Sequence, residues 1–147
     1  MYTHILLATD GSHLSQKAVH AAIELAAKFG SELVAVKVVP HYIQTYFEGS
    51  FAISDEDVKN IEGQWVQGAE KVLSHVKEQA QLKGIQAKTM VVKSDDIAQG
   101  LIDTAEQLKS DLIVMASHGR RGIKRLLLGS ETQQVLTHSH TPVLVLR

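Results

Sequence analysis

The sequence predicts an α/β protein built on an open, doubly wound sheet of five parallel strands with helices on both faces. Short aliphatic runs alternate along the chain with segments of helical period, which is the pattern of βαβ units joined by right-handed crossovers. The runs are almost continuously apolar, as expected for parallel strands covered on both sides. A chain of 147 residues is also long enough to bury one hydrophobic core.

Five runs rich in aliphatic and β-branched residues are expected to form the strands. They are Ile5 to Ala8, Leu33 to Val39, Thr89 to Val92, Leu112 to Met115 and Val143 to Leu146. In sheets of this kind, ligands bind beyond the carboxyl ends of the strands, at the point where the strand order reverses. The segments that follow the strands are therefore the first candidates for a functional site.

Two helices are expected between the first three strands. The first should end at Gly30, and the second, which is the longest, should be capped by Ser54 and end at Gly84. The apolar face of the first helix is predicted to hold Leu14, Ala18, Ala22, Leu25 and Phe29. That of the second is predicted to hold Val58, Ile61, Trp65, Ala69, Val72 and Val76.

Two shorter helices are expected after the third and fourth strands. The third helix should present Ile97, Leu101, Ala105 and Leu108 to the core. The fourth should run from about Glu131 to His138, after which Thr141-Pro142 leads into the last strand.

Composition and charge exclude several classes of protein. Lys+Arg (15) nearly balances Asp+Glu (16), so no overall field draws the chain to nucleic acid or to anionic lipid. The sequence has no cysteine, which excludes disulfides, thiolate catalysis and cysteine-ligated zinc. The apolar run Ile5 to Ala8 is too short for a signal peptide or a membrane span. We expect a single cytoplasmic domain over residues 1–147, with neither a nucleic-acid nor a membrane partner.

One long connection, Pro40 to Ser54, joins the second strand to the second helix. It contains four aromatic residues, Tyr42, Tyr46, Phe47 and Phe51. These side chains either pack the connection onto the domain or form a lid or partner surface. The sequence leaves both readings open.

The segment from Met115 to Ser130 carries the strongest chemical signal. It follows a predicted strand, precedes a predicted helix and contains no acidic residue, and its cations are Arg120, Arg121, Lys124 and Arg125. Glycines such as Gly119 and Gly129 let backbone N–H groups approach phosphate oxygens, and the helix start adds unpaired amides. Ser130 can donate its hydroxyl and cap the helix. The alternative is an ordinary glycine-bearing loop with a basic, solvated face.

This segment resembles the ATP-binding signature of universal stress proteins, G-x2-G-x9-G-[ST]. Gly119, nine intervening residues and Gly129-Ser130 are in register with it, whereas Ala116 stands where the signature has its first glycine. The resemblance extends over the whole chain. It includes Ile5 to Ser12, Val36 to Val39 and Thr141 to Val145.

The resemblance implies a Rossmann-like fold of the adenine nucleotide alpha hydrolase kind that binds ATP. It places Gly119, Gly129, Ser130 and the amide of Glu131 at the phosphates, and Ala116 and Ser117 beside the ribose. It also places Ala8 and Asp10 on the nucleoside side, and gives the backbone of Val38 to the adenine edge. Asp10 has an alternative role, because Asp-Gly-Ser before a helix is also a common turn and cap.

Two further expectations concern assembly and activity. Val143 to Leu146 is an apolar strand close to the C-terminus, so an unprotected edge there favours pairing with a second copy. The resemblance likewise implies a homodimer through antiparallel fifth strands. His118 could act as a general base, but its loop holds no Asp or Glu to orient it. We therefore expect a regulatory, stress-response protein that holds ATP with Mg²⁺, with no catalytic residue and no metal site formed by the protein alone. The alternatives are a slow ATPase or phosphotransferase, and a nucleotide-free dimeric interaction module.

Overall fold

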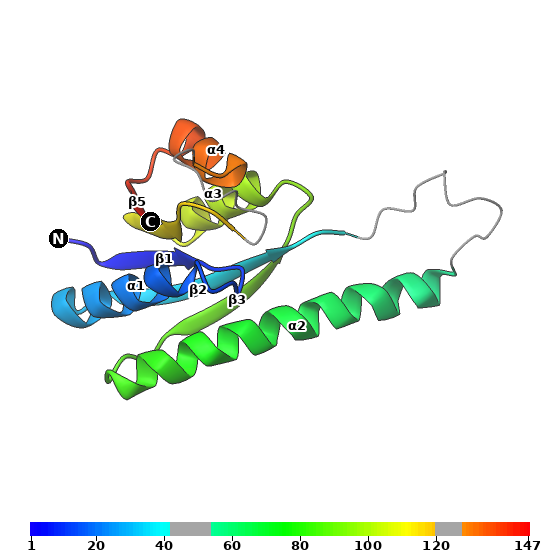
Figure 1. Ribbon diagram of the computed structural model, residues 1–147, viewed down its shortest axis with the longest axis horizontal. Coiled ribbons are helices and arrows are strands. Elements are labelled where there is room, and N and C mark those ends of the chain that lie inside the picture. Colours follow the sequence, from blue (N-terminus) through cyan, green and yellow to red (C-terminus); the bar gives the residue numbers. More distant parts are fainter. Residues whose placement is uncertain (42–53, 120–127) are drawn as a thin grey trace.

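The computed structural model describes residues 1–41, 54–119 and 128–147, which form one five-stranded parallel sheet in the order β3-β2-β1-β4-β5 (Figure 1). The strands are β1 (His4–Ala8), β2 (Glu32–Val39), β3 (Lys88–Lys93), β4 (Leu112–Ala116) and β5 (Val143–Leu146). This confirms the predicted fold class and all five predicted strands, each within about a residue of its expected bounds. The aromatic residues predicted between Pro40 and Ser54 lie outside the described residues.

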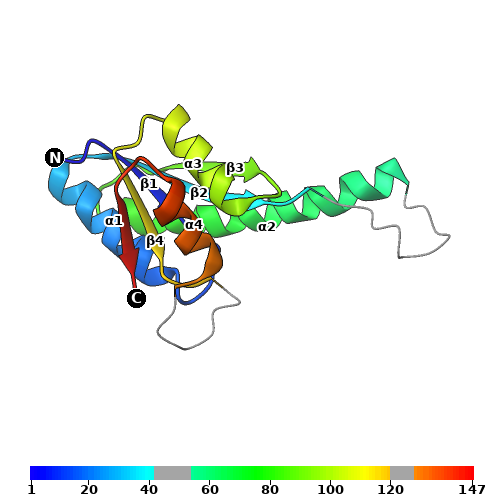
Figure 2. The same ribbon diagram turned by 90° about the horizontal axis from the view of Figure 1, so that it is seen from above.

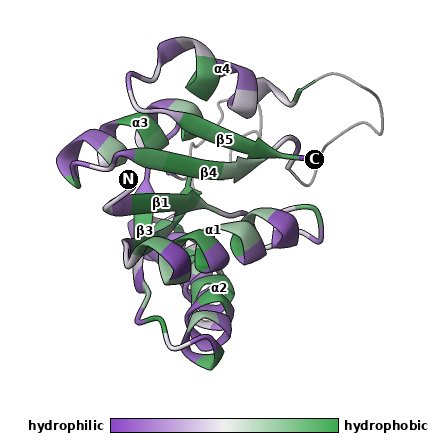
Figure 3. Cartoon of the chain, turned by 90° about the vertical axis from the view of Figure 1, so that its left-hand side faces the viewer, coloured by the Kyte–Doolittle hydropathy of each residue, from purple (hydrophilic) through white to green (hydrophobic). Residues whose placement is uncertain are grey.

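Four helices cover the two faces of the sheet (Figures 1 and 2). They are α1 (Gln16–Phe29), α2 (Asp55–Leu82), α3 (Ile97–Gln107) and α4 (Ser130–His138). Alternate residues of β1 face opposite sides: Ile5 and Leu7 pack with α1 and α2, whereas Leu6 and Ala8 pack with α3 and α4. The sheet therefore has a hydrophobic layer on each face, and Figure 3 shows these apolar strands between helices whose outer surfaces are largely hydrophilic.

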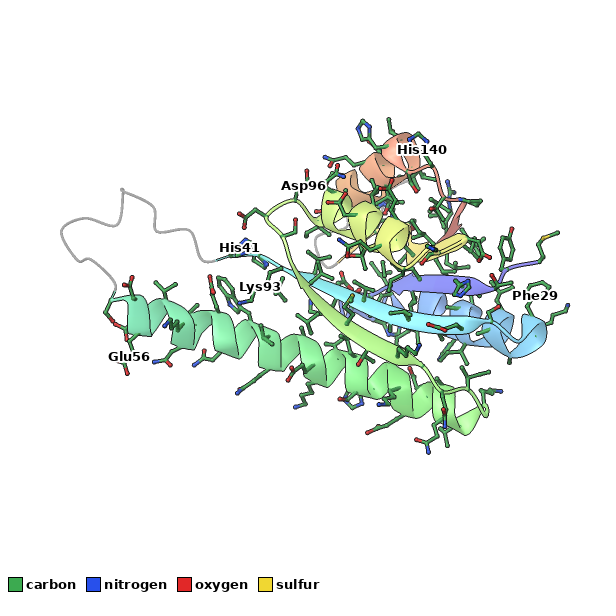
Figure 4. All side chains as sticks on the ribbon, turned by 180° about the vertical axis from the view of Figure 1, so that it is seen from behind. Phe29, His41, Glu56, Lys93, Asp96 and His140 are labelled. Atoms are coloured by element: carbon green, nitrogen blue, oxygen red, sulfur yellow. The ribbon has the colours of Figure 1, made fainter. Side chains whose placement is uncertain are left out.

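The first helix begins later than the sequence predicts, and its predicted apolar face is confirmed at Ala18, Ala22 and Leu25 but not at Leu14 and Phe29. Leu14 precedes α1 and is 50% exposed, because the chain first makes a turn in which the Ser15 N–H donates to the Ser12 carbonyl at 3.2 Å. The buried residues of α1 are Ala18, Val19, Ala22, Ile23 and Ala26. Phe29, also predicted to be buried, lies at the end of α1 with its ring edge-on to Tyr2, 6.0 Å between centroids (Figure 4). Gly30 ends the helix as predicted, in the left-handed conformation.

The second helix confirms its predicted cap, but only its second half packs on the sheet. The Ser54 hydroxyl accepts a hydrogen bond from the Asp57 N–H at 3.1 Å. The buried residues of α2 are Ala69, Leu73, Val76 and Ala80. The first turns extend past the sheet (Figure 1). Trp65, nearer the middle of the helix, is 37% exposed. The predicted apolar face is therefore only half-buried at Val58 and Ile61 and exposed at Trp65.

Asp111 anchors the first strand at the amino-terminal edge of the sheet. Its Oδ2 accepts hydrogen bonds from the Thr3 N–H at 2.8 Å and the Thr3 hydroxyl at 2.7 Å, and its Oδ1 accepts from the His4 N–H at 3.0 Å. The Asp111 N–H in turn donates to the His4 carbonyl at 2.9 Å. This residue therefore fixes the start of β1 against the start of β4.

The strand order determines where a ligand site is expected. From β1 the chain moves outward through β2 to β3, and it then crosses to the other side of β1 to form β4 and β5. The order thus reverses between β1 and β4, whose carboxyl ends are followed by Thr9 and Ser117. Of the helices in the described residues, none combines the length and the apolar character that a membrane span requires.

Candidate functional site

A pocket of about 570 Å³ lies at the carboxyl ends of β1 and β4, where the strand order reverses. Every predicted binding residue except Ser117 lines it. These residues are Ala8, Asp10, Val38, Ala116, Gly119, Gly129, Ser130 and Glu131. Another hollow, of about 660 Å³, lies between α2 and β3, and none of the predicted residues lines it. The fold thus brings together residues that are more than 100 positions apart in the sequence.

Ser117 links the end of β4 to β5 and to the residue that precedes α4. It is buried; its N–H donates to the Leu146 carbonyl at 2.7 Å, and its carbonyl accepts from the Gly129 N–H at 2.8 Å. A Cβ on Gly129 would approach this same carbonyl to 3.2 Å. The segment that leaves the sheet at Ser117 therefore returns to the same point at Gly129, and the absence of a side chain there permits the close approach.

A side-chain hydrogen bond also joins β4 to α4. The Thr132 hydroxyl, in the first turn of α4, donates to the Ala116 carbonyl at 3.0 Å. Ala116 itself pairs with Leu146 in the sheet. Together with the Ser117–Gly129 contact, this fixes the amino end of α4 over the carboxyl end of β4.

Asp10 makes the turn contact that the sequence offers as one of its two roles, and it also lines the pocket. Its Oδ1 accepts from the Ser12 N–H at 2.9 Å, which is the turn role. Its Oδ2 lies toward the β4 loop, where a Cβ on Gly119 would stand 2.8 Å away. Gly11, between Asp10 and Ser12 in the chain, has φ +78°, a conformation that favours glycine. The turn therefore holds one oxygen of the carboxylate and directs the other across the pocket.

The backbone of Val38 is directed toward the pocket by the register of β2. The Val36 carbonyl accepts from the Thr9 N–H at 3.1 Å, and Ala8–Val36 is the last pair between β1 and β2. Backbone groups two residues apart in a strand point the same way, so those of Val38 point past the end of β1. These groups therefore face the pocket that Val38 lines.

Several lining residues were missed at the sequence level. They are Thr9, Val36, Lys37, Ile97, Leu101, Met115 and Thr132. Ile97 and Leu101 come from α3, where they were assigned only to the core, and they give the pocket an apolar wall. Lys37 brings a cation from β2, and its Nζ donates to the Asp10 carbonyl at 3.5 Å. The only available signal was the position of Lys37 beside Val38.

The start of α4 corrects one predicted role. Gly129, not Ser130, is the N-cap residue, and it makes no side-chain cap hydrogen bond. Ser130 is the first helical residue, and its hydroxyl donates to Glu131 Oε2 at 3.1 Å. The first amides of a helix have no intrahelical carbonyl partner, so this end of α4 presents donors toward the pocket.

His118 also lines the pocket, and its Nδ1 lies 3.0 Å from the Ser117 hydroxyl oxygen. Over residues 1–41, 54–119 and 128–147, no group of three or more His, Asp or Glu side chains is arranged to hold a metal ion. The predicted cations Arg120, Arg121, Lys124 and Arg125 lie outside the described residues.

Comparisons with known proteins show the family of this chain. A profile of the universal stress protein family matches residues 1–147. A universal stress protein of Methanocaldococcus jannaschii is 35% identical over 149 residues, an alignment that covers 100% of this chain and 83% of that protein. The universal stress protein YxiE of Bacillus subtilis is 32% identical over 149 residues, with 100% of both chains covered.

Solved structures show the same fold. The universal stress protein UspA of Lactobacillus plantarum superposes with a TM-score of 0.85 at 24% identity, covering 99% of this chain and 98% of that one. Two others, each with a TM-score of 0.70, are a universal stress protein in complex with cAMP (22% identity, 99% and 97% covered) and one from Archaeoglobus fulgidus in complex with dAMP (20% identity, 99% and 98% covered). The strand order, the full-length profile match and the two full-length relatives together establish that this chain belongs to the universal stress protein family.

Proposed function

We propose that the pocket binds ATP together with Mg²⁺ and that the bound nucleotide serves as a regulatory ligand in a stress response. The observation that carries the proposal is the convergence of Gly119, Gly129 and the amino end of α4 opposite Asp10, at the point where the strand order reverses. Two glycines and free helix amides suit phosphate oxygens, and a carboxylate suits a ribose hydroxyl.

The pocket has the size that such a ligand needs, with an apolar side for the base and a polar side for the sugar and phosphates. Its volume of about 570 Å³ lies within the usual range for small-molecule sites. Ile97 and Leu101 offer an apolar wall for the adenine ring beside the Val38 backbone. Asp10 and Ala8 would adjoin the ribose, with Ala116 beside them, and Gly129, Ser130 and the Glu131 amide would meet the phosphates.

Mg²⁺ fits the same end of the pocket. This ion is usually held by one or two carboxylates together with phosphate oxygens of the ligand. Asp10 and Glu131 are the carboxylates that line the pocket among the described residues. Asp10, whose Oδ2 lies beside Gly119, would bind the ion only with the nucleotide in place, and the ion would neutralise part of the phosphate charge.

Two structural neighbours support the choice of an adenine nucleotide, since those proteins were solved in complex with cAMP and with dAMP. Both share the fold of this chain, although at 22% and 20% identity they support the fold more than the details of a site. For this chain the nucleotide class therefore rests mainly on its own pocket.

We also propose that the protein acts in the cytoplasm as a homodimer through β5. β5 is an edge strand of the sheet, and within the described residues it pairs with β4 alone. Leu144 is 37% exposed on this strand. An apolar edge with unpaired backbone groups favours addition of a second strand.

One observation favours a second candidate function, slow ATP hydrolysis. His118 lines the pocket and is held by the Ser117 hydroxyl, so a titratable ring stands beside the proposed phosphate site. A nucleotide-free dimeric interaction module is the remaining alternative.

The test that separates these functions is the identification of a bound nucleotide. The purified protein is denatured, the released small molecules are analysed by mass spectrometry, and Mg²⁺–ATP binding to stripped protein is measured by calorimetry. A released adenine nucleotide and saturable binding at one site per chain support the proposal. Absence of both would leave the nucleotide-free interaction module.

A further inference from the structure

Glu131 places a negative charge at the end of the pocket where the proposed phosphate contacts gather. It is the second residue of α4, and it lines the pocket together with Gly129 and Ser130. Its Oε2 accepts a hydrogen bond from the Ser130 hydroxyl at 3.1 Å. The carboxylate thus engages a donor that an incoming phosphate would otherwise use.

Two opposing electrostatic effects act on an anion at this end of the pocket. The amino end of α4 attracts anions, and an acidic side chain in the first turn offsets that attraction. Asp10 is a second carboxylate on the lining, and Lys37 donates to the Asp10 backbone carbonyl. A phosphate group that contacted Gly129 and Ser130 would lie near Glu131, the next residue in α4, whose carboxylate already accepts a hydrogen bond from the Ser130 hydroxyl. The repulsion increases with each phosphate charge that no cation compensates.

We propose that Glu131 is a specificity-determining residue that makes this pocket distinguish adenine nucleotides by the net charge of their phosphate chain. The site then takes a Mg²⁺-complexed triphosphate or a nucleotide with one phosphate in preference to the free triphosphate. This inference rests on the adenine-nucleotide function proposed above and concerns the same pocket.

The test compares the affinities of a series of adenine ligands, measured by calorimetry on the full chain. Adenosine, AMP, ADP and ATP are titrated in EDTA, and ATP is titrated again with excess Mg²⁺. Glu131→Gln keeps the shape of the side chain and removes its charge. We expect the variant to bind free ATP about fivefold more tightly, ADP and AMP with progressively smaller gains, and adenosine and Mg²⁺–ATP within about twofold of wild type.

Four controls separate charge from folding. Glu131→Asp retains the charge and should bind each ligand with the wild-type affinity. Glu106→Gln makes the same chemical change at an exposed site of α3 outside the pocket and should leave all the ligand affinities unaltered. Melting temperatures report the small loss of helix stability that removal of a first-turn carboxylate causes. In 0.5 M salt the gain for free ATP should shrink, because exposed charges are screened.

The outcomes distinguish this inference from the function on which it rests. If Glu131→Gln changes the affinity for adenosine and for free ATP by the same factor, or leaves free ATP unchanged, charge discrimination by Glu131 is wrong while nucleotide binding stands. If wild type and variant bind none of the five ligands, the nucleotide-binding function itself is overturned, and the inference with it.

Discussion

The carboxylate of Asp10 and the backbone of Gly119 face each other so closely that a Cβ on Gly119 would lie 2.8 Å from Asp10 Oδ2. These residues belong to the loops that follow β1 and β4, the two strands that flank the change in strand order. Side-chain carbons do not normally approach an oxygen this closely, so the two loops reach this separation because residue 119 has no side chain. The contact defines one wall of the pocket.

Gly119→Ala should weaken Mg²⁺–ATP binding about tenfold, or ~1.4 kcal/mol, because the Asp10 carboxylate or the loop must move. Calorimetry measures the loss. Asp10→Ala removes the opposing oxygen, so in that background Gly119→Ala should cost less than about twofold further, which is the non-additivity expected for residues in contact. Effects that simply multiplied in the double variant would show that the clash with Asp10 is not the cause.

Gly129→Val should reduce nucleotide affinity by displacing the amino end of α4. The new Cβ points toward the Ser117 carbonyl, 3.2 Å away, and it would strain the hydrogen bond between Gly129 N–H and that carbonyl. Gly68→Val is the matched control, since a Cβ at this α2 position meets nothing within 4 Å. The measurement is ATP affinity beside the melting temperature of each variant. Unchanged affinity in a folded Gly129→Val protein would contradict the phosphate assignment.

The sequence was sufficient to predict the strands and their surroundings because buried parallel strands are continuously apolar. It also located the two sides of the pocket, since glycines and a carboxylate that follow strands converge wherever those strands are neighbours. Periodicity could not show which turns of α2 are buried, so Trp65, which is 37% exposed, was assigned to the core. Nor could it show that a turn held by Ser12 and Ser15 delays α1 and exposes Leu14.

The contributions of Lys37 and Ile97 to the pocket could not have been predicted from local pattern. Lys37 lies inside an apolar strand, and its amine reaches the Asp10 carbonyl only because β2 lies beside β1. Ile97 matched the core period of α3, yet it stands at the helix start where the pocket opens. Both depend on tertiary neighbours, which a single sequence does not specify.

Val145→Pro should convert a dimer into a monomer while the fold remains intact. The Pro142 and Leu146 carbonyls accept from Ile113 and Ser117 on β4, so the backbone groups of the alternate residue Val145 point to the outer edge. Proline removes an N–H there without removing a β4 hydrogen bond. Light scattering should change from twice 16.1 kDa to 16.1 kDa. A wild-type protein that is monomeric at micromolar concentration would contradict the proposed dimer.

Stability should fall in acid as Asp111 becomes protonated. Burial raises the pKa of this carboxyl, but hydrogen bonds from the Thr3 N–H, the Thr3 hydroxyl and the His4 N–H outweigh it and hold the pKa below its ordinary value of 3.8. A carboxyl with a lowered folded pKa stabilises the protein above its unfolded pKa of about 3.9, and this contribution is lost as pH falls through the folded value. Asp111→Asn should therefore cost about 1 kcal/mol in urea unfolding at pH 7 and less below pH 3. A difference that stayed constant over this range would contradict the mechanism.

ATP turnover should be slow or absent even when the nucleotide is bound. Hydrolysis at a useful rate needs a group that orients the attacking water, as well as charge placed where it develops on the transferring phosphoryl group. The amino end of α4 meets part of the second need. For the first, the described lining offers His118, whose Nδ1 contacts the Ser117 hydroxyl oxygen at 3.0 Å.

We expect this site to bind the ground state and the transition state about equally well, which would lower the dissociation constant without raising the catalytic rate. The decisive experiment follows radiolabelled ATP under excess substrate with wild type and with His118→Ala. We expect both proteins to release phosphate far more slowly than about 1 per second, the lower end of ordinary enzyme rates, and at similar rates. Sustained turnover at or above that rate that disappeared in His118→Ala would instead make His118 a catalytic base and the protein an ATPase.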